Sequence, residues 1–214
     1  MTEATALVRV PWARLERQRQ AGKFGIWVFL ASETLFFGAL LLTYTVCRVE
    51  HPDAFAAAGR ETNIWFGTIN TAILLTSSLT MAVASQAAAK IGRARQLVLA
   101  CLGSTAALGV AFMIVKGFEY KEDIDKHLVP GAGFALQQPA AQLFYGLYWL
   151  VTGVHAIHLT IGIVLVIRLI VLGAARRIRL RGSPELEVTA LYWHLVDVVW
   201  IFLYPLIYLP GRAS

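Results

Sequence analysis

Five long apolar stretches constrain this chain more than any other feature. They cover residues 24–46, 65–89, 96–118, 142–172 and 188–209. A helix needs about 20 apolar residues to cross the hydrocarbon core of a bilayer, so each stretch is long enough to span a membrane. A hydrophobic content of 57% and a mean hydropathy of +0.62 exclude an ordinary soluble domain. The sequence therefore predicts an all-α integral membrane protein, a bundle of five transmembrane helices.

The charged residues between these stretches predict how the bundle is oriented. Residues 1–23 form a basic tail that lacks the apolar core of a cleaved signal peptide, and residues 24–214 leave room for a single transmembrane domain. Twelve of the 19 Lys and Arg residues fall in this tail, in the 90–95 turn and in the 176–181 loop. Cytoplasmic loops carry the excess of Lys and Arg. The count predicts a cytoplasmic N-terminus and an outside C-terminus, and it explains the net charge of +6 without nucleic-acid binding.

Ionisable residues occur inside three of the spans, where they are costly and usually mark a function or a specific contact. At 1.5 Å per residue, Glu33 and Asp197 lie about 14 Å deep from the cytoplasmic side, and His158 about 15 Å. His155 lies about 20 Å deep and His194 about 9 Å. We expect at least one buried polar pair among Glu33, His158, His194 and Asp197. His194 and Asp197 are three residues apart on a helix, so they share a face and are able to pair. The alternative is that each side chain satisfies itself against backbone carbonyls.

The histidines do not form a recognisable metal motif. His155 and His158 have helical spacing for a shared metal, which His194 could join. The sequence nevertheless has no HExxH, no Glu-x-x-His, no CxxCH and no adjacent His pair. The two cysteines lie far apart and predict no disulfide framework. We therefore expect no metal, no other cofactor and no catalytic residue in this chain.

Five motifs resemble, in order, those of subunit III of the haem-copper respiratory oxidases. They are WVFLASETLFF with Glu33, INTAILLTSSLT with Asn70, KGFEYKE with Glu119 and Tyr120, TGVHAIHLTIG with His155 and His158, and YWHLVDVVW with Trp193 and Trp200, which Glu187 precedes. The likeness extends over nearly the whole chain from Phe24 onward. Long members of that family have seven spans, so this chain resembles its short, five-span bacterial forms.

The resemblance implies a non-redox subunit of a terminal oxidase in the bacterial inner (plasma) membrane. Such a subunit docks on catalytic subunit I and subunit II, which hold the haems and copper. Glu33 matches the family's buried, carbodiimide-reactive carboxylate. The family's subunit supports proton uptake and prolongs the active lifetime of the oxidase, partly by holding phospholipids. The KGFEY and YWH forms favour cytochrome c as the electron donor of the assembly.

Other readings remain open at this stage. Within the same family, the chain could be subunit III of a quinol oxidase or an accessory protein of nitric oxide reductase. From a different class, it could be an independent proton channel that uses Glu33, His158 and Asp197 as a relay. A lipid-binding scaffold without a proton role is a further alternative.

Overall fold

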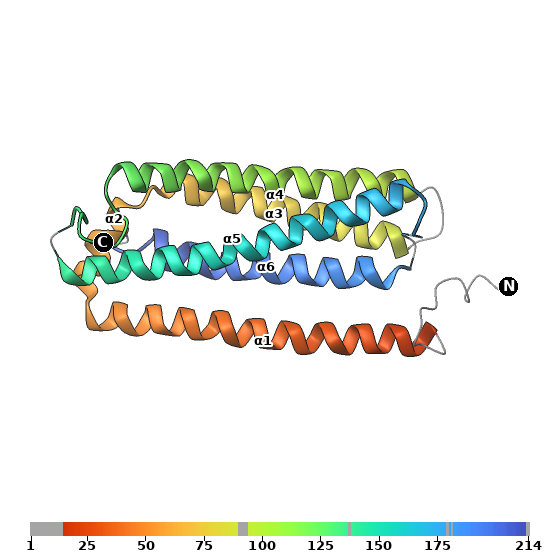
Figure 1. The fold of residues 1–214 in the computed structure, drawn as a ribbon, viewed down its shortest axis with the longest axis horizontal. Helices are drawn as coiled ribbons and strands as arrows, with labels where there is room; N and C mark the ends of the chain where they lie inside the picture. The colour runs from red at the N-terminus through yellow and green to blue at the C-terminus, as the bar shows by residue number, and fades with distance from the viewer. Residues whose placement is uncertain (1–14, 90–93, 137, 179, 181, 213–214) are drawn as a thin grey trace.

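The computed structural model describes residues 15–89, 94–136, 138–178, 180 and 182–212. These residues form six helices, namely α1 (Leu15–Glu50), α2 (Pro52–Glu61), α3 (Ile64–Ala89), α4 (Ala94–Asp125), α5 (Pro139–Ala174) and α6 (Pro184–Tyr208) (Figure 1). All except α2 are long and apolar enough to cross a membrane, so the predicted five spans are present. Several basic residues used to predict the orientation lie outside the described residues: Arg9, Arg14, Lys90, Arg93, Arg179 and Arg181.

The connection between the first two spans contains a helix that the sequence reading did not predict. Helix α2 begins at Pro52, whose ring fixes a helical φ at a position where no amide hydrogen is needed. Asp53 lies in its first turn, where a negative charge favours the helix dipole. Phe55 is fully buried and packs edge-to-face against Tyr44 of α1 and Phe144 of α5. This short helix therefore covers one end of the bundle.

Helix α4 continues well beyond the predicted end of its span at residue 118. It reaches Asp125, and its 32 residues extend about 48 Å, which exceeds the roughly 30 Å of the hydrocarbon core. The charged residues 119–125 suggested a loop, but they support a helix through ion pairs at helical spacing, Lys116–Glu119 and Glu122–Lys126. Glu119 therefore lies on a helix and not in the predicted connection.

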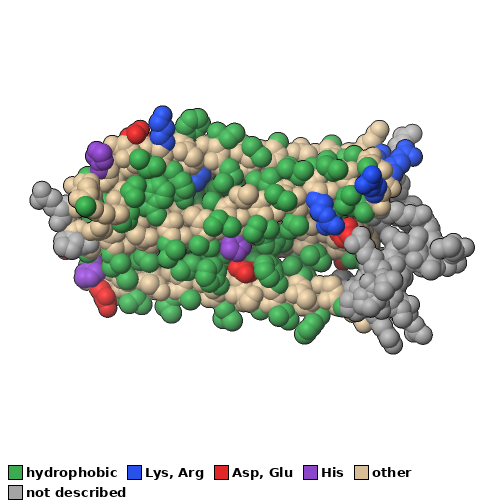
Figure 2. All heavy atoms as spheres, viewed as in Figure 1, with side chains coloured by type: hydrophobic (Ala, Val, Ile, Leu, Met, Phe, Trp, Pro, Cys, Tyr) green, Lys and Arg blue, Asp and Glu red, His purple; other side chains and the backbone are tan. Residues whose placement is uncertain are grey.

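The bundle is arranged around α6, which contacts α1, α3 and α5, while α3 and α4 pack along each other. Helix α1 lies at the edge of the bundle (Figure 1). Figure 2 shows hydrophobic side chains spread over most of the visible face, with the charged side chains mainly towards the two ends. A surface of this kind suits contact with lipid or with other membrane subunits.

Trp193 is fully buried where α4, α5 and α6 meet. A Cβ atom at Gly109 of α4 would lie 2.8 Å from Cη2 of Trp193, and one at Gly162 of α5 would lie 3.1 Å from its Cε3. The indole Nε1 donates to Oγ of Ser77 on α3 at 3.2 Å. The two glycines thus let the helices approach closely around one large ring, as small residues commonly do in membrane bundles.

Candidate functional site

Glu33 and His158 form the expected polar pair between α1 and α5. Oε2 of Glu33 lies 3.0 Å from Nε2 of His158, and the two side chains are 18% and 16% exposed. Nδ1 of His158 lies 2.8 Å from the carbonyl oxygen of Val154, so the Nδ1 hydrogen is donated there. The contact between Glu33 and His158 then needs one proton, carried either by the carboxyl group or by Nε2.

The pair is held from three helices. Phe37 of α1 packs edge-to-face on the imidazole of His158, with ring centroids 5.1 Å apart. The hydroxyl of Tyr192 on α6 donates to the backbone carbonyl of His158 at 2.9 Å. A proton-sharing pair that remains partly exposed at mid-helix is able to exchange its proton with a neighbouring subunit or with water.

His194 and Asp197, which their spacing allowed to pair, do not form a hydrogen bond with each other among the described residues. Nδ1 of His194 lies 2.8 Å from Oγ of Ser78 on α3. Asp197 is buried, with 3% of its surface exposed. The two residues share a helix face as their spacing requires, but the serine hydroxyl of the neighbouring helix is the partner of the imidazole. Helix spacing predicted the face and missed the partner, which comes from another part of the chain.

His155 faces a different part of the bundle from His158. It is fully buried, and its ring lies between Phe112 of α4 and Trp200 of α6, with centroid distances of 5.8 and 5.2 Å. Neither ring nitrogen has a hydrogen-bond partner among the described residues. Among all the residues that the structure describes, no three His, Cys, Asp or Glu side chains lie close enough together to hold a metal ion.

The remaining motif residues occupy packing positions or line a pocket. Asn70 is fully buried on α3, and Nε1 of Trp200 donates to Oγ1 of Thr71 at 3.1 Å. Glu187 lines an open pocket of about 420 Å³ between α1, α3 and α6, together with Trp27, Ala82, Ser85, Gln86, Ala190, Leu191 and His194. The pocket combines apolar walls with polar side chains, as sites for amphiphilic molecules do.

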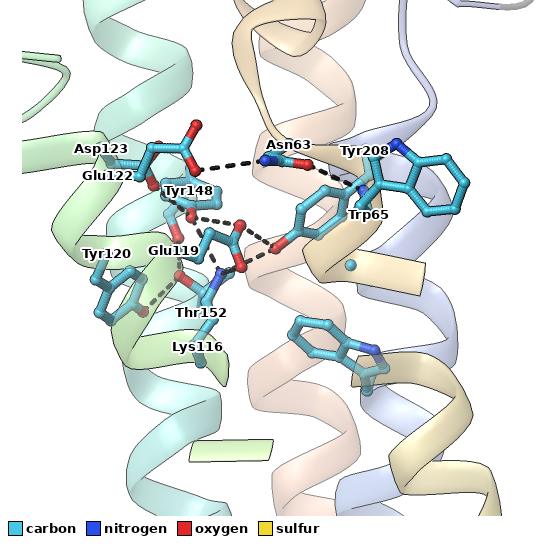
Figure 3. A network of polar contacts seen from close by, with 12 residues as sticks. Asn63, Trp65, Lys116, Glu119, Tyr120, Glu122, Asp123, Tyr148, Thr152 and Tyr208 are labelled. Atoms are coloured by element: carbon cyan, nitrogen blue, oxygen red, sulfur yellow. Dashed lines mark hydrogen bonds and ion pairs between the residues drawn. The ribbon is translucent and has the colours of Figure 1, made fainter. Parts of the chain in front are cut away.

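A second polar cluster was not predicted from the sequence, although Glu119 was named as a motif residue, because its three charged residues were assigned to a span end and to a connection. Lys116, Glu119 and Asp123 of α4 meet Tyr148 of α5 and Tyr208 of α6 (Figure 3). All five side chains are buried. The i, i+3 and i+4 spacing of the three charged residues could have predicted a shared helix face. The two tyrosines, far along the chain, carry no such signal.

The surroundings of this cluster extend it towards the end of α4. Tyr120 stacks on Trp149 with ring centroids 4.3 Å apart. Its hydroxyl lies 2.8 Å from Oγ1 of Thr152 (Figure 3). The more exposed Glu122 pairs with Lys126 at 2.7 Å, and this contact raises the pKa of Lys126 above its ordinary value. Glu122 and Lys126 thus neutralise each other near the end of α4.

The fold and these contacts define a five-span helical membrane protein with ionisable side chains between its helices. Residues 16–212 match the family model described as "Cytochrome c oxidase subunit III". Cytochrome c oxidase subunit 3 of Bacillus subtilis (strain 168) is 32% identical over 192 residues, which cover 89% of this chain and 86% of the relative. The corresponding protein of Alkalihalophilus pseudofirmus is 33% identical, covering 92% and 91%.

A relative that is named as a subunit of a ubiquinol oxidase is also similar to this chain. Cytochrome bo(3) ubiquinol oxidase subunit 3 of Pseudomonas aeruginosa is 30% identical over 189 residues, covering 88% of this chain and 84% of the relative. The chain belongs to the cytochrome c oxidase subunit III family, a family of haem-copper oxidase subunits.

Proposed function

We propose that this chain is a non-redox subunit III that binds subunits I and II of a cytochrome c oxidase in the bacterial inner membrane and supports proton uptake by the assembly. The family membership carries the subunit assignment. The proton role rests on one observation, the 3.0 Å contact between Glu33 and His158 at mid-helix. The haems and copper are proposed to lie in the partner subunits, and phospholipid is a further proposed partner.

The orientation is part of the proposal. Residues 1–23 would be a cytoplasmic tail, and residues 24–214 the transmembrane domain. A contact of Arg95, near the start of α4, supports this orientation. Its guanidinium donates to the carbonyl oxygens of Gly173 and Ala174 at the end of α5. The start of α4 and the end of α5 therefore lie at the same end of the bundle, and positive charge favours the cytoplasmic side.

A Glu33→Gln substitution in the assembled oxidase tests the proton role. The amide of glutamine is able to donate to Nε2 of His158, so the contact between α1 and α5 is kept while the exchangeable carboxyl proton is removed. We expect slower proton uptake during turnover and a shorter active lifetime. Glu50→Gln, which removes an exposed carboxylate at the C-terminal end of α1, is the control. It should leave proton uptake and active lifetime unchanged.

Two outcomes favour the alternative functions. Unchanged proton uptake and lifetime in the Glu33→Gln complex would favour a scaffold that holds lipid and partner subunits. Proton leak through liposomes that contain the purified chain alone would favour an independent channel. Oxidation of reduced cytochrome c or of quinol by the wild-type complex distinguishes the two electron donors.

A further inference from the structure

One buried cluster consists of Lys116, Glu119, Asp123, Tyr148 and Tyr208. If the lysine and both acids are ionised, the cluster has fewer hydrogens than it has hydrogen-bond and ion-pair contacts. We infer that Asp123 holds a proton and donates it in a hydrogen bond to Tyr148, which makes the cluster a neutral proton-binding site between α4, α5 and α6. The inference is independent of the proposed function, because it uses only contacts within this chain.

The ammonium group of Lys116 contacts three oxygen atoms of the cluster. Its Nζ lies 3.0 Å from the hydroxyl of Tyr148, 2.9 Å from that of Tyr208 and 3.1 Å from Oε2 of Glu119. The contacts with the two tyrosines are hydrogen bonds and the contact with Glu119 is an ion pair, so Tyr148 accepts a hydrogen from Lys116 and does not donate one to it. Tyr208 has one hydroxyl hydrogen, which goes to Oε1 of Glu119 at 2.6 Å.

Tyr148 is where the hydrogens run short. Its hydroxyl lies 2.9 Å from Oε1 of Glu119 and 2.8 Å from Oδ2 of Asp123 (Figure 3). A tyrosine hydroxyl has a single hydrogen, and an ionised carboxylate has none to donate. Either the single hydrogen is shared between two ionised carboxylates, or one of the two carboxyl groups supplies a second hydrogen. A proton on one carboxyl group gives each contact its own hydrogen, and it is the arrangement that we infer.

The number of donors around each acid indicates which one holds the proton. Glu119 forms an ion pair with the ammonium of Lys116 and accepts from Tyr208, and it is within reach of Tyr148. Among the described residues, Asp123 has a side-chain hydrogen bond with Tyr148 alone. Donors stabilise the ionised form of a carboxyl group. Glu119 is thus the carboxylate, and Asp123 is the neutral acid whose proton points to the oxygen of Tyr148.

The balance of charge leads to the same assignment. Lys116 and Glu119 are 2% exposed and Asp123 is 5% exposed, and an uncompensated charge at such depth is costly. With Asp123 protonated, the positive Lys116 and the negative Glu119 cancel. The other titratable groups around the cluster are Glu61, Tyr120, Glu122, Lys126, Tyr145 and His155. Within this group Glu122 and Lys126 pair with each other, so they supply no spare positive charge to Asp123.

Infrared spectroscopy of the purified oxidase complex tests the inference directly. The complex is prepared with aspartate labelled with ¹³C at the side-chain carboxyl group, and spectra at neutral pH are compared in H₂O and D₂O. We expect the wild-type complex to show the C=O band of one protonated, labelled aspartic acid that is absent from the Asp123→Asn complex. The Glu122→Gln complex, with an exposed carboxylate removed from the same helix, should keep the band. Identical wild-type and Asp123→Asn spectra in this region would overturn the inference.

A second variant separates the charge balance from the hydrogen count. In Glu119→Gln, Asp123 becomes the remaining acid able to neutralise Lys116, so the labelled band should be lost although Asp123 is still present. An assembled Glu119→Gln complex that retains the band would contradict the assignment. Asp123→Asn should assemble normally, because its amide donates to Tyr148 in place of the acid hydroxyl. Failure of the Asp123→Asn variant to assemble would also count against a neutral Asp123. The comparison of wild type with Asp123→Asn therefore tests the protonation of Asp123 even if Glu119→Gln does not assemble.

Discussion

A methyl group added at Gly109 should destabilise the junction of α4, α5 and α6. The new Cβ would lie 2.8 Å from Cη2 of Trp193 and 3.0 Å from Cγ1 of Ile163. The indole has little room to move, because it is fully buried and hydrogen-bonded to Ser77. Overpacking a well-filled core costs about 1–3 kcal/mol. Alanine offsets about 1 kcal/mol of this, because it is the better helix former.

Gly103 on the same helix is the matched control for this prediction. A Cβ there would meet no heavy atom of the described residues within 4 Å, so Gly103→Ala should gain about 1 kcal/mol from helix propensity. Gly109→Ala should therefore be less stable than Gly103→Ala by about 1–3 kcal/mol. Unfolding of the purified chain by increasing SDS in mixed micelles, followed by tryptophan fluorescence, measures the difference. Equal stability of the two variants would refute the close approach of the three helices around Trp193.

Three further substitutions test individual hydrogen bonds in the same assay. Ser78→Ala should lower stability by about 1 kcal/mol, because Nδ1 of His194 loses its partner; an unchanged stability would exclude that contact. Tyr44→Phe should have a similar effect, because the tyrosine hydroxyl bonds the carbonyl of Leu206 at 2.6 Å, and Tyr44→Leu should be worse by the lost ring contacts. Arg95→Ala should lower the stability by about 0.5–1.5 kcal/mol, because the last carbonyl groups of α5 lose their donor. If Arg95→Lys lowers the stability as much as Arg95→Ala, the bidentate contact matters more than the charge.

The five spans could be predicted from the sequence because each follows from a local property, an apolar stretch of sufficient length. The contact of Glu33 with His158 was also within reach, since depth calculated along two separate helices placed both residues at a similar level. The partner of His194 was not, because Ser78 lies on another helix, far from His194 in the sequence. A polar contact between helices depends on helix rotation, which hydropathy does not specify.

The cluster around Lys116 shows a second reason for a missed site. Charged residues at the end of an apolar stretch were assigned to a loop, but here the helix continues through them to Asp125. Burial of these charges depends on Tyr148 and Tyr208, which come from two other helices. The same limit applies to α2, since its burial rests on Phe55 meeting aromatic rings of α1 and α5. Local spacing predicts a shared face, and tertiary packing decides whether that face is buried.

Affinity purification of the chain from its own membrane in mild detergent would show directly whether it is a subunit of a haem-copper oxidase. A reduced-minus-oxidised spectrum and identification of the co-purifying subunits provide the measurement. We expect a haem signal together with a large, many-span partner subunit. A chain that elutes alone and colourless, under conditions in which other oxidase complexes of the same membrane stay intact, would contradict its role as a subunit of a haem-copper oxidase.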